Sequence, residues 1–175
     1  MPELIIGVMS DSHDNMYNVE KALKIFREMG VKVIVHLGDI ISPFIVKRMI
    51  ELKYEGLIVI AIYGNNDGDR VLLSRLFASA GWRIFDSPAV EVINGKKLLM
   101  MHGHSSVEYS RELAYSLAKG MNVDAVLYGH THQRDSKVIN GKVVLNPGET
   151  YGYLTGSATV AILDLDEMKP KFIEL

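Results

Sequence analysis

Short runs of apolar residues, each of strand length, alternate with segments of helical periodicity through the first half of this chain. This alternation limits the fold more than any other feature. The candidate strands are Leu4–Met9, Lys32–Leu37 and Leu57–Tyr63. Helical patterns lie at about Tyr17–Met29, from Ser42-Pro43 onward, and at about Arg70–Ala80. Strand–helix–strand order predicts parallel strands joined by right-handed crossovers.

The second half predicts antiparallel hairpins. Asn94-Gly95 separates the candidate strands Val90–Ile93 and Lys96–Met101, and Asn140-Gly141 separates Lys137–Ile139 from Lys142–Leu145. The remaining elements are a helix at about Val107–Lys119 and strands at Val123–Tyr128, Ser157–Asp164 and Lys171–Leu175. We expect one α/β domain over residues 1–175, with either a mixed sheet or two sheets packed face to face and helices outside.

Length and charge limit the function class. A domain of 175 residues hides roughly 70% of the surface that its unfolded chain exposes, which is enough for a core of its own. The formal net charge of −2 argues against strong nucleic-acid binding and against a polybasic membrane surface. The chain has no cysteine, which excludes disulfides and thiolate metal sites. No apolar run exceeds strand length, so we expect no signal peptide, no membrane span and a cytoplasmic location.

Polar side chains follow the predicted strands in pairs two residues apart. Four of the six histidines form His102-Gly-His104 and His130-Thr-His132, whereas chance placement would give about 0.2 such pairs. Asp11-Ser-His13 has the same spacing. Residues two apart in an extended segment point the same way, so each pair can face one point. Each pair follows a predicted strand, at the edge of an α/β sheet where ligands bind.

Two further strand ends supply Asp39 and Asn65. The combined set of carboxylates, amide and imidazoles is too rich in oxygen for a thiolate-type zinc site and too large for one ion. It suits two divalent ions such as Mn²⁺, Fe²⁺, Ni²⁺ or Zn²⁺. A single-metal oxygenase triad needs only two histidines and a carboxylate, and it would leave four of these strand-end residues without a role.

The order of the motifs resembles the signature of the calcineurin-like metallophosphoesterases. The motifs are Asp11-x-His13, Gly38-Asp39, Gly64-Asn65, His102-Gly-His104 and Gly129-His130-Thr-His132. Asn146-Pro147-Gly148, in itself a turn sequence, is similar to a further loop of the small bacterial and archaeal phosphodiesterases related to YfcE. The resemblance runs from about Ile5 to Gly148 and implies a four-layer α/β/β/α sandwich with mixed sheets.

The resemblance also implies a site for two divalent metal ions. One ion would bind Asp11, His13, Asp39 and His132, and the other Asp39, Asn65, His102 and His130, with Asp39 as the bridge. Two ions about 3.5–4 Å apart can hold a hydroxide between them that attacks a phosphate ester. We expect Mn²⁺ first, with Ni²⁺, Fe²⁺ or Zn²⁺ as alternatives. The implied enzyme is a phosphodiesterase acting on a small phosphate-ester or nucleotide-like substrate.

The chain departs from the family pattern at Asn66. Many relatives carry a histidine there, which is thought to protonate the departing alkoxide, and an amide cannot act as a general acid near neutral pH. Either the enzyme works well only on esters whose leaving group needs no proton, such as aryl phosphodiesters, or another residue replaces the histidine. His104 is our candidate for a substitute acid, because it shares a loop with His102 and imidazole is the usual acid near pH 7. An equally weighted alternative is that His104 only hydrogen-bonds the substrate phosphate or a neighbouring loop.

Other polar residues near these motifs have simpler interpretations. His36 lies inside a predicted strand, so we expect a core histidine or an outer partner of the ligands. We expect Asp14 and Asn15 to cap the first helix. Asp67 and Asp69 are expected to begin the third helix.

A non-enzymatic scaffold is the main alternative function. The same fold serves as a scaffold in the eukaryotic retromer subunit that resembles this subfamily, so fold alone does not separate the two functions. Every ligand position of this chain carries a competent residue, which favours the enzyme. A homo-oligomer is compatible with both functions.

Overall fold

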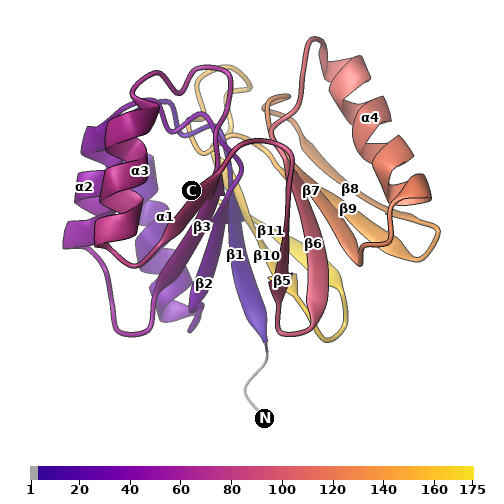
Figure 1. Ribbon diagram of the computed structural model, residues 1–175, viewed down its shortest axis with the longest axis horizontal. Coiled ribbons are helices and arrows are strands. Elements are labelled where there is room, and N and C mark those ends of the chain that lie inside the picture. Colours follow the sequence, from indigo (N-terminus) through magenta and orange to yellow (C-terminus); the bar gives the residue numbers. More distant parts are fainter. Residues whose placement is uncertain (1–3) are drawn as a thin grey trace.

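The computed structural model describes residues 4–175 and contains two β-sheets packed face to face (Figure 1). The first sheet contains, in spatial order, β11 (Lys169–Glu174), β10 (Thr159–Asp164), β1 (Ile5–Met9), β2 (Val33–His36), β3 (Ile58–Ile62) and β4 (Arg83–Phe85). The second contains β5 (Ala89–Ile93), β6 (Lys96–Met101), β7 (Ala125–Tyr128), β9 (Lys142–Pro147) and β8 (Arg134–Ile139). Each sheet includes parallel and antiparallel pairs, so both are mixed.

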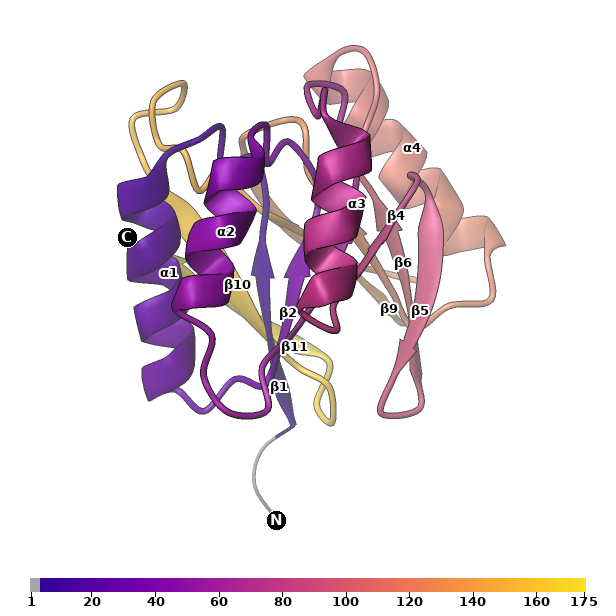
Figure 2. The same ribbon diagram turned by 60° about the vertical axis from the view of Figure 1, so that its left-hand side comes forward.

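Helices cover the outer face of each sheet, which confirms the four-layer α/β/β/α sandwich. Helices α1 (Met16–Glu28), α2 (Pro43–Glu51) and α3 (Arg70–Ser79) lie in one row across the first sheet (Figure 2). Helix α4 (Val107–Gly120) covers the second sheet (Figure 1). Within residues 4–175, none of the helices combines the length and apolarity needed to span a membrane.

The central strands bury side chains on both faces. In β2, Ile34 packs toward α1–α3 and Val35 packs toward the second sheet. In β7, Val126 packs toward α4 and Leu127 packs toward the first sheet. Strands covered on both sides read as continuous apolar runs because neither face can carry polar groups without a cost in free energy.

Both predicted hairpins are confirmed by their turns. The turn residues have positive φ angles: Asn94 48°, Gly95 79°, Asn140 50° and Gly141 76°. Two consecutive residues with positive φ are the requirement of a type I′ turn, and Asn-Gly meets it with little strain. The second hairpin is longer than predicted, because β8 already begins at Arg134.

Strand β4 is the element that the sequence did not predict. It is only three residues long, Arg83–Phe85, and pairs in parallel with β3 at the edge of the first sheet. Its residues are exposed or half-buried, so it has neither an apolar run nor a full alternation. Three residues are too few to show a period of hydrophobicity, so the sequence could not predict this strand. Its extended conformation depends on pairing with β3.

The loops after β1, β2, β3, β6 and β7 meet at one end of the sandwich, at the top of Figure 1. Backbone hydrogen bonds join the loops after β1 and β2. The carbonyl of His102, after β6, accepts the N–H of Gly129, after β7. Parallel strands share the direction in which their carboxyl ends point. This geometry brings together the polar pairs that the sequence analysis identified.

Candidate metal centre

Most of the candidate ligands have left-handed backbone conformations. Their φ angles are 51° for Asp11, 40° for His13, 56° for Asp39, 67° for His130 and 60° for His132. Each such residue costs about 1–3 kcal/mol unless its surroundings enforce the conformation. Here the N–H of Asp11 donates to the carbonyl of Gly38 at 3.0 Å, and the N–H of His13 donates to the carbonyl of Asp39 at 3.1 Å. The loops after β1 and β2 therefore hold each other in these conformations.

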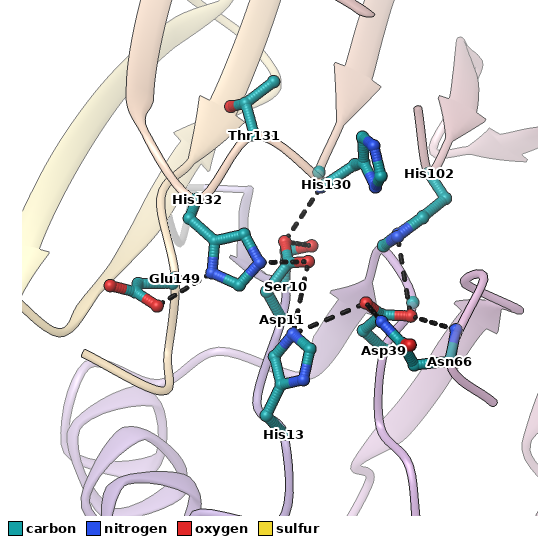
Figure 3. A network of polar contacts seen from close by, with 12 residues as sticks. Ser10, Asp11, His13, Asp39, Asn66, His102, His130, Thr131, His132 and Glu149 are labelled. Atoms are coloured by element: carbon teal, nitrogen blue, oxygen red, sulfur yellow. Dashed lines mark hydrogen bonds and ion pairs between the residues drawn. The ribbon is translucent and has the colours of Figure 1, made fainter. Parts of the chain in front are cut away.

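Asp11, His13 and His132 form one cluster of side chains (Figure 3). The Asp11 carboxylate is buried, and its Oδ1 lies 3.6 Å from Nε2 of His132 and 3.9 Å from Nε2 of His13. Neither Asp11 Oδ1 nor His13 Nε2 has a hydrogen-bond partner within residues 4–175. Buried polar atoms are nearly always paired, so two unpaired ligand atoms this close together fit a shared cation.

Asp11, Asp39 and His102 form a second cluster, which shares Asp11 with the first (Figure 3). Nε2 of His102 lies 3.5 Å from Oδ1 of Asp39 and 3.0 Å from Oδ1 of Asn65. The same Asn65 oxygen lies 2.9 Å from Nδ1 of His130. Oδ2 of Asp39 lies 3.4 Å from Nε2 of His13. Asp39 therefore connects the second cluster to His13 of the first.

The outer hydrogen bonds of three histidines determine which ring nitrogen faces the centre. The acceptors are the Leu37 carbonyl for Nδ1 of His102 (2.7 Å), the Ser105 carbonyl for Nε2 of His130 (2.9 Å) and the Glu149 carboxylate for Nδ1 of His132 (2.8 Å). In a neutral imidazole the other nitrogen then carries a lone pair. These lone pairs face oxygen atoms, which is favourable only with a proton or a metal ion between them. An outer hydrogen bond to a carbonyl or carboxylate is typical of metal-binding histidines.

The carboxylates give the centre a preference for positive charge. Burial disfavours a charged imidazolium, yet the hydrogen bond to Asp39 and the charges of Asp11 and Asp39 raise the pKa of His102 to about 9. Burial raises the pKa of Asp11, against the effect of the nearby His102 and His132. Burial also acts to raise the pKa of Asp39, but hydrogen bonds from His102 and Asn66 outweigh it and lower that pKa. A divalent cation would supply the compensating charge.

Asn66 binds the carboxylate of Asp39 (Figure 3). Its side-chain amide donates to Oδ2 at 2.7 Å, and its backbone N–H donates to Oδ1 at 2.9 Å. Hydrogen bonds to an ionised carboxylate are stronger than neutral ones. Asn66 therefore orients Asp39, a role that the sequence analysis did not assign.

Asp67 does not begin α3, so that prediction is wrong. Its carboxylate is buried and accepts the backbone N–H groups of Asp39 (3.0 Å), Ile41 (2.7 Å) and Gly64 (2.7 Å). It ties the loop after β2 to the loop after β3. The predicted helix start is confirmed for Asp69, which accepts the N–H of Leu72 at 3.0 Å.

Asp14 and Asn15, both predicted to cap α1, have different roles. Asn15 is the cap, because its side-chain oxygen accepts the N–H of Asn18 at 3.1 Å. Asp14 accepts the N–H of Ser42 at 2.9 Å, so its predicted role is wrong. The carboxylate of Asp14 joins the loop after β1 to the start of α2.

His36 is buried beneath the candidate ligands, as predicted. The backbone N–H of Gly38 donates to Nδ1 at 3.2 Å, so Nε2 carries the ring proton and donates to Oγ of Ser12 at 3.1 Å. Burial lowers the pKa of His36 to about 4. His36 therefore supports, as a neutral ring, the loops that carry Asp11 and Asp39, and it belongs to neither ligand cluster.

Glu149 and Asn146 position the histidine loop after β7, and the sequence analysis missed both roles. One oxygen of the buried Glu149 accepts His132 Nδ1, and the other accepts the N–H (2.6 Å) and hydroxyl (2.7 Å) of Thr155. The Asn146 amide donates to the Gly129 carbonyl and to Oγ1 of Thr131, both at 3.0 Å. The signal in the sequence was the Asn146-Pro147-Gly148 motif, which was interpreted as a turn and directly precedes Glu149.

His104 is exposed, and its side chain belongs to neither cluster. Its backbone N–H donates to Oγ of Ser110 at 2.9 Å, and that hydroxyl donates to the His104 carbonyl at 2.7 Å. Its ring lies 6.2 Å from the ring of Tyr109, measured between centroids. Within residues 4–175 neither ring nitrogen is engaged in a hydrogen bond.

Comparison with known proteins links this geometry to one family. The calcineurin-like phosphoesterase superfamily domain matches residues 4–168. The chain is 38% identical over 172 residues to "Phosphodiesterase MJ0936" of Methanocaldococcus jannaschii, a match that covers 97% of this chain and 98% of that protein.

Solved structures have the same fold. A structure described as a novel archaeal phosphodiesterase matches with a TM-score of 0.87 and 36% identity, covering 98% of this chain and 99% of the other. The phosphoesterase YfcE from E. coli matches with a TM-score of 0.68 and 20% identity, covering 97% and 98% of the two chains. Vps29 from Entamoeba histolytica matches with a TM-score of 0.67 and 19% identity, covering 98% and 99%. At such identities the last two show the fold alone.

Proposed function

Because the chain belongs to the calcineurin-like phosphoesterase superfamily, we propose that it is a phosphodiesterase that depends on two divalent metal ions. The observation that carries this proposal is the pair of adjoining ligand clusters, Asp11–His13–His132 and Asp11–Asp39–His102. The similarity of the chain to "Phosphodiesterase MJ0936" supports a diester as the substrate. A small phosphate-ester or nucleotide-like diester is the substrate class that we expect.

We assign the ligands to the two ions as the family pattern implies. One ion would be held by Asp11, His13, Asp39 and His132, and the other by Asp39, Asn65, His102 and His130. The unpaired Asp11 Oδ1 and His13 Nε2 support this assignment, as do the inward lone pairs of His102, His130 and His132. When bound, such ions lower the pKa of a water molecule and offset charge on the phosphate oxygens.

The protein's own contribution is to hold these groups in place before substrate arrives. The Leu37 and Ser105 carbonyls and the Glu149 carboxylate fix the rotation of three histidine rings. Asn66 fixes both oxygens of Asp39. Rigid outer partners of this kind typically change metal affinity or activity by roughly 10–100-fold when they are removed.

Hydrolysis also requires a proton for the leaving group. The oxygen of water loses a proton to solvent as it bonds to phosphorus, the bond from phosphorus to the ester oxygen breaks, and that ester oxygen takes up a proton. Asn66 cannot supply the proton, and its amide is already bound to Asp39. We assign this role to His104, whose side chain is exposed and which shares the loop after β6 with the proposed ligand His102.

The test is a metal-supplemented assay of protein that has been treated with a chelator. We expect turnover of bis(p-nitrophenyl) phosphate to return with Mn²⁺ and, to different degrees, with Ni²⁺, Fe²⁺ or Zn²⁺. Saturation at two ions per chain is expected in metal analysis. Saturation at one ion or none would contradict the two-metal mechanism. The absence of turnover with every monoester, diester and cyclic nucleotide would contradict the proposed enzymatic activity.

The second candidate function is a scaffold of the same fold. The structural similarity to Vps29 suggests this function, but at 19% identity the similarity concerns the fold alone. A scaffold has no need for buried, unpaired ligand atoms such as Asp11 Oδ1, and these favour the enzyme. If the scaffold function were correct, variants of the metal ligands would keep their binding partners and the wild type would hydrolyse no phosphate ester.

A further inference from the structure

A small cavity of about 210 Å³ opens beside the candidate metal centre. The proposed ligands Asn65 and His102 line it, and so do Tyr63, Arg70 and Ser87. The mechanism proposed above has no role for Arg70, although this residue brings a permanent positive charge to a cavity that touches the centre. Its surroundings show what that charge can bind.

The guanidinium of Arg70 is held in a defined orientation. Its Nε donates to the Asp67 carbonyl and its Nη2 to the Gly64 carbonyl, both at 3.2 Å. The group also lies over the ring of Tyr63, at 4.9 Å from the centroid, and the Tyr63 hydroxyl donates to the Arg70 carbonyl at 3.0 Å. An arginine fixed in this way loses little side-chain entropy when it binds a ligand.

The charge of Arg70 is only weakly compensated. Its nearest carboxylate is that of Asp86, which also lines the cavity, with Nη1 to Oδ1 at 3.4 Å. The side chains of Arg70 and Asp86 are 49% and 87% exposed. Exposed ion pairs contribute little to stability, so an anion can replace Asp86 at Nη1 without a large cost.

Ser87 adds a neutral donor to the same cavity. Its Oγ accepts the backbone N–H of His102 at 2.9 Å, and its hydroxyl hydrogen has no acceptor within residues 4–175. A phosphate group has three terminal oxygens and can accept from a guanidinium and a hydroxyl at once. The pair of donors therefore fits a phosphate better than it fits a neutral base or sugar.

We propose that this cavity binds a second phosphate group of the substrate, separate from the phosphodiester that is hydrolysed. The proposal rests on the proposed function, because it places the scissile phosphate at the adjoining ligands Asn65 and His102. It narrows the substrate class to phosphodiesters that carry a further phosphate, as a phosphorylated nucleotide does. Arg70 is then a specificity-determining residue.

Two chromogenic substrates test the proposal directly. Thymidine 5′-(p-nitrophenyl phosphate) is compared with the same compound bearing a 3′-phosphate, using wild type, Arg70→Gln and Arg70→Lys with Mn²⁺. We expect wild type to favour the 3′-phosphorylated compound by about tenfold in kcat/KM, as one partly exposed charge-assisted bond allows. Arg70→Gln should lose this preference through KM, and Arg70→Lys should keep part of it.

Binding provides a readout that is independent of turnover. Titration calorimetry compares thymidine 5′-monophosphate with thymidine 3′,5′-bisphosphate and thymidine 5′-diphosphate. At least one second phosphate should tighten binding by about tenfold in wild type and not in Arg70→Gln. Arg75→Gln is the matched control, because Arg75 is exposed on the same helix and outside the cavity lining.

The outcomes separate this inference from the proposed function. Hydrolysis of both substrates with equal kcat/KM, together with equal binding of all three nucleotides, would overturn the second-phosphate site and leave the phosphodiesterase standing. An equal loss on both substrates in Arg70→Gln would also overturn it, because Arg70 would then act on the scissile phosphate or on the fold. If neither substrate is hydrolysed but the bisphosphate binds more tightly in a way that depends on Arg70, the second-phosphate site would be supported. The proposed phosphodiesterase activity would then be contradicted.

Discussion

Single atoms decide what each side chain of the candidate centre can do. His36 and His102 are both buried histidines, but their hydrogen bonds differ. Nδ1 of His36 accepts a backbone N–H and its Nε2 donates to Ser12, so neither nitrogen is free. Nδ1 of His102 donates outward to Leu37, which leaves Nε2 facing Asp39 and Asn65. Burial alone would not distinguish a supporting histidine from a candidate ligand.

A pair of substitutions tests this distinction. We expect Asp39→Asn to lower metal occupancy and to cost more than about 100-fold in rate, because a bridging carboxylate would contact both ions. His36→Gln should stay within the roughly 10–100-fold range of an outer partner. Metal analysis and steady-state kinetics of the two variants measure this. Equal losses of metal and rate would show that the ligand assignment is wrong.

His104 is tested by the acidity of the leaving group. Loss of a positioned general acid costs roughly 10²–10⁴ in rate, but only where the leaving oxygen needs a proton. His104→Asn should therefore slow an alkyl diester far more than an aryl diester. Similar losses on both esters would show that His104 binds the substrate phosphate. Tyr109→Leu is a suitable control, because it removes the ring beside His104 and leaves the imidazole.

At the level of elements, the loops after neighbouring strands support one another. Strand ends supply the candidate ligands, but the loops that carry them contain strained residues such as Asp39. The carboxylate of Asp67 accepts three N–H groups from the loops after β2 and β3. Gly64 belongs to the same arrangement, because a Cβ there would overlap the Asp39 carboxylate. The geometry of these loops is therefore a property of the pair.

Two aspartates in the same loop allow a matched test of this support. Asp67→Ala leaves three N–H groups without their acceptor, and we expect a loss of about 3–5 kcal/mol in the free energy of unfolding. Asp69→Ala removes only a helix cap and should cost about 1 kcal/mol. Urea unfolding measures both values, and Asp67→Asn provides a milder variant should the alanine variant not fold. Equal effects of the two alanine variants would contradict the proposed link between the loops.

Across the whole molecule, the candidate centre lies between the two sheets. Asp11, Asp39 and Asn65 follow strands of the first sheet, whereas His102 and His132 follow strands of the second. The apolar layer that joins the sheets lies below them. Ions bound at this place would connect the two halves of the sandwich, so metal binding and folding should be coupled.

This coupling can be measured as a thermal shift. At a metal concentration of about 100 times Kd, a site present only in the folded state adds about 2.7 kcal/mol, or roughly 5–10 °C in Tm for a protein of this size. We expect Mn²⁺ to produce such a shift in wild type and in His36→Gln. Asp11→Asn should abolish most of it. An unchanged Tm of wild type at saturating metal would contradict a site that spans both sheets.

Local chemistry accounts for what could be predicted from the amino-acid order. The apolar runs, the Asn-Gly turns and the polar pairs after strands depend on neighbours in the chain, and they predicted the elements and the polar residues at the strand ends. The four-layer arrangement was implied by the resemblance to the family. Strand β4 could not be predicted, because three residues are too few to show a period of hydrophobicity. Assignment of the ligands to metal ions stays a prediction.

Long-range contacts account for the rest. Asp67 and Asp69 are equivalent in local sequence, but the first is buried against two loops and the second caps a helix. Likewise, the inward nitrogen of His132 depends on Glu149, which follows β9. Such roles are set by groups from other strands and loops that meet only after the sheets have formed, because a hydrogen bond depends on distance in space rather than along the chain.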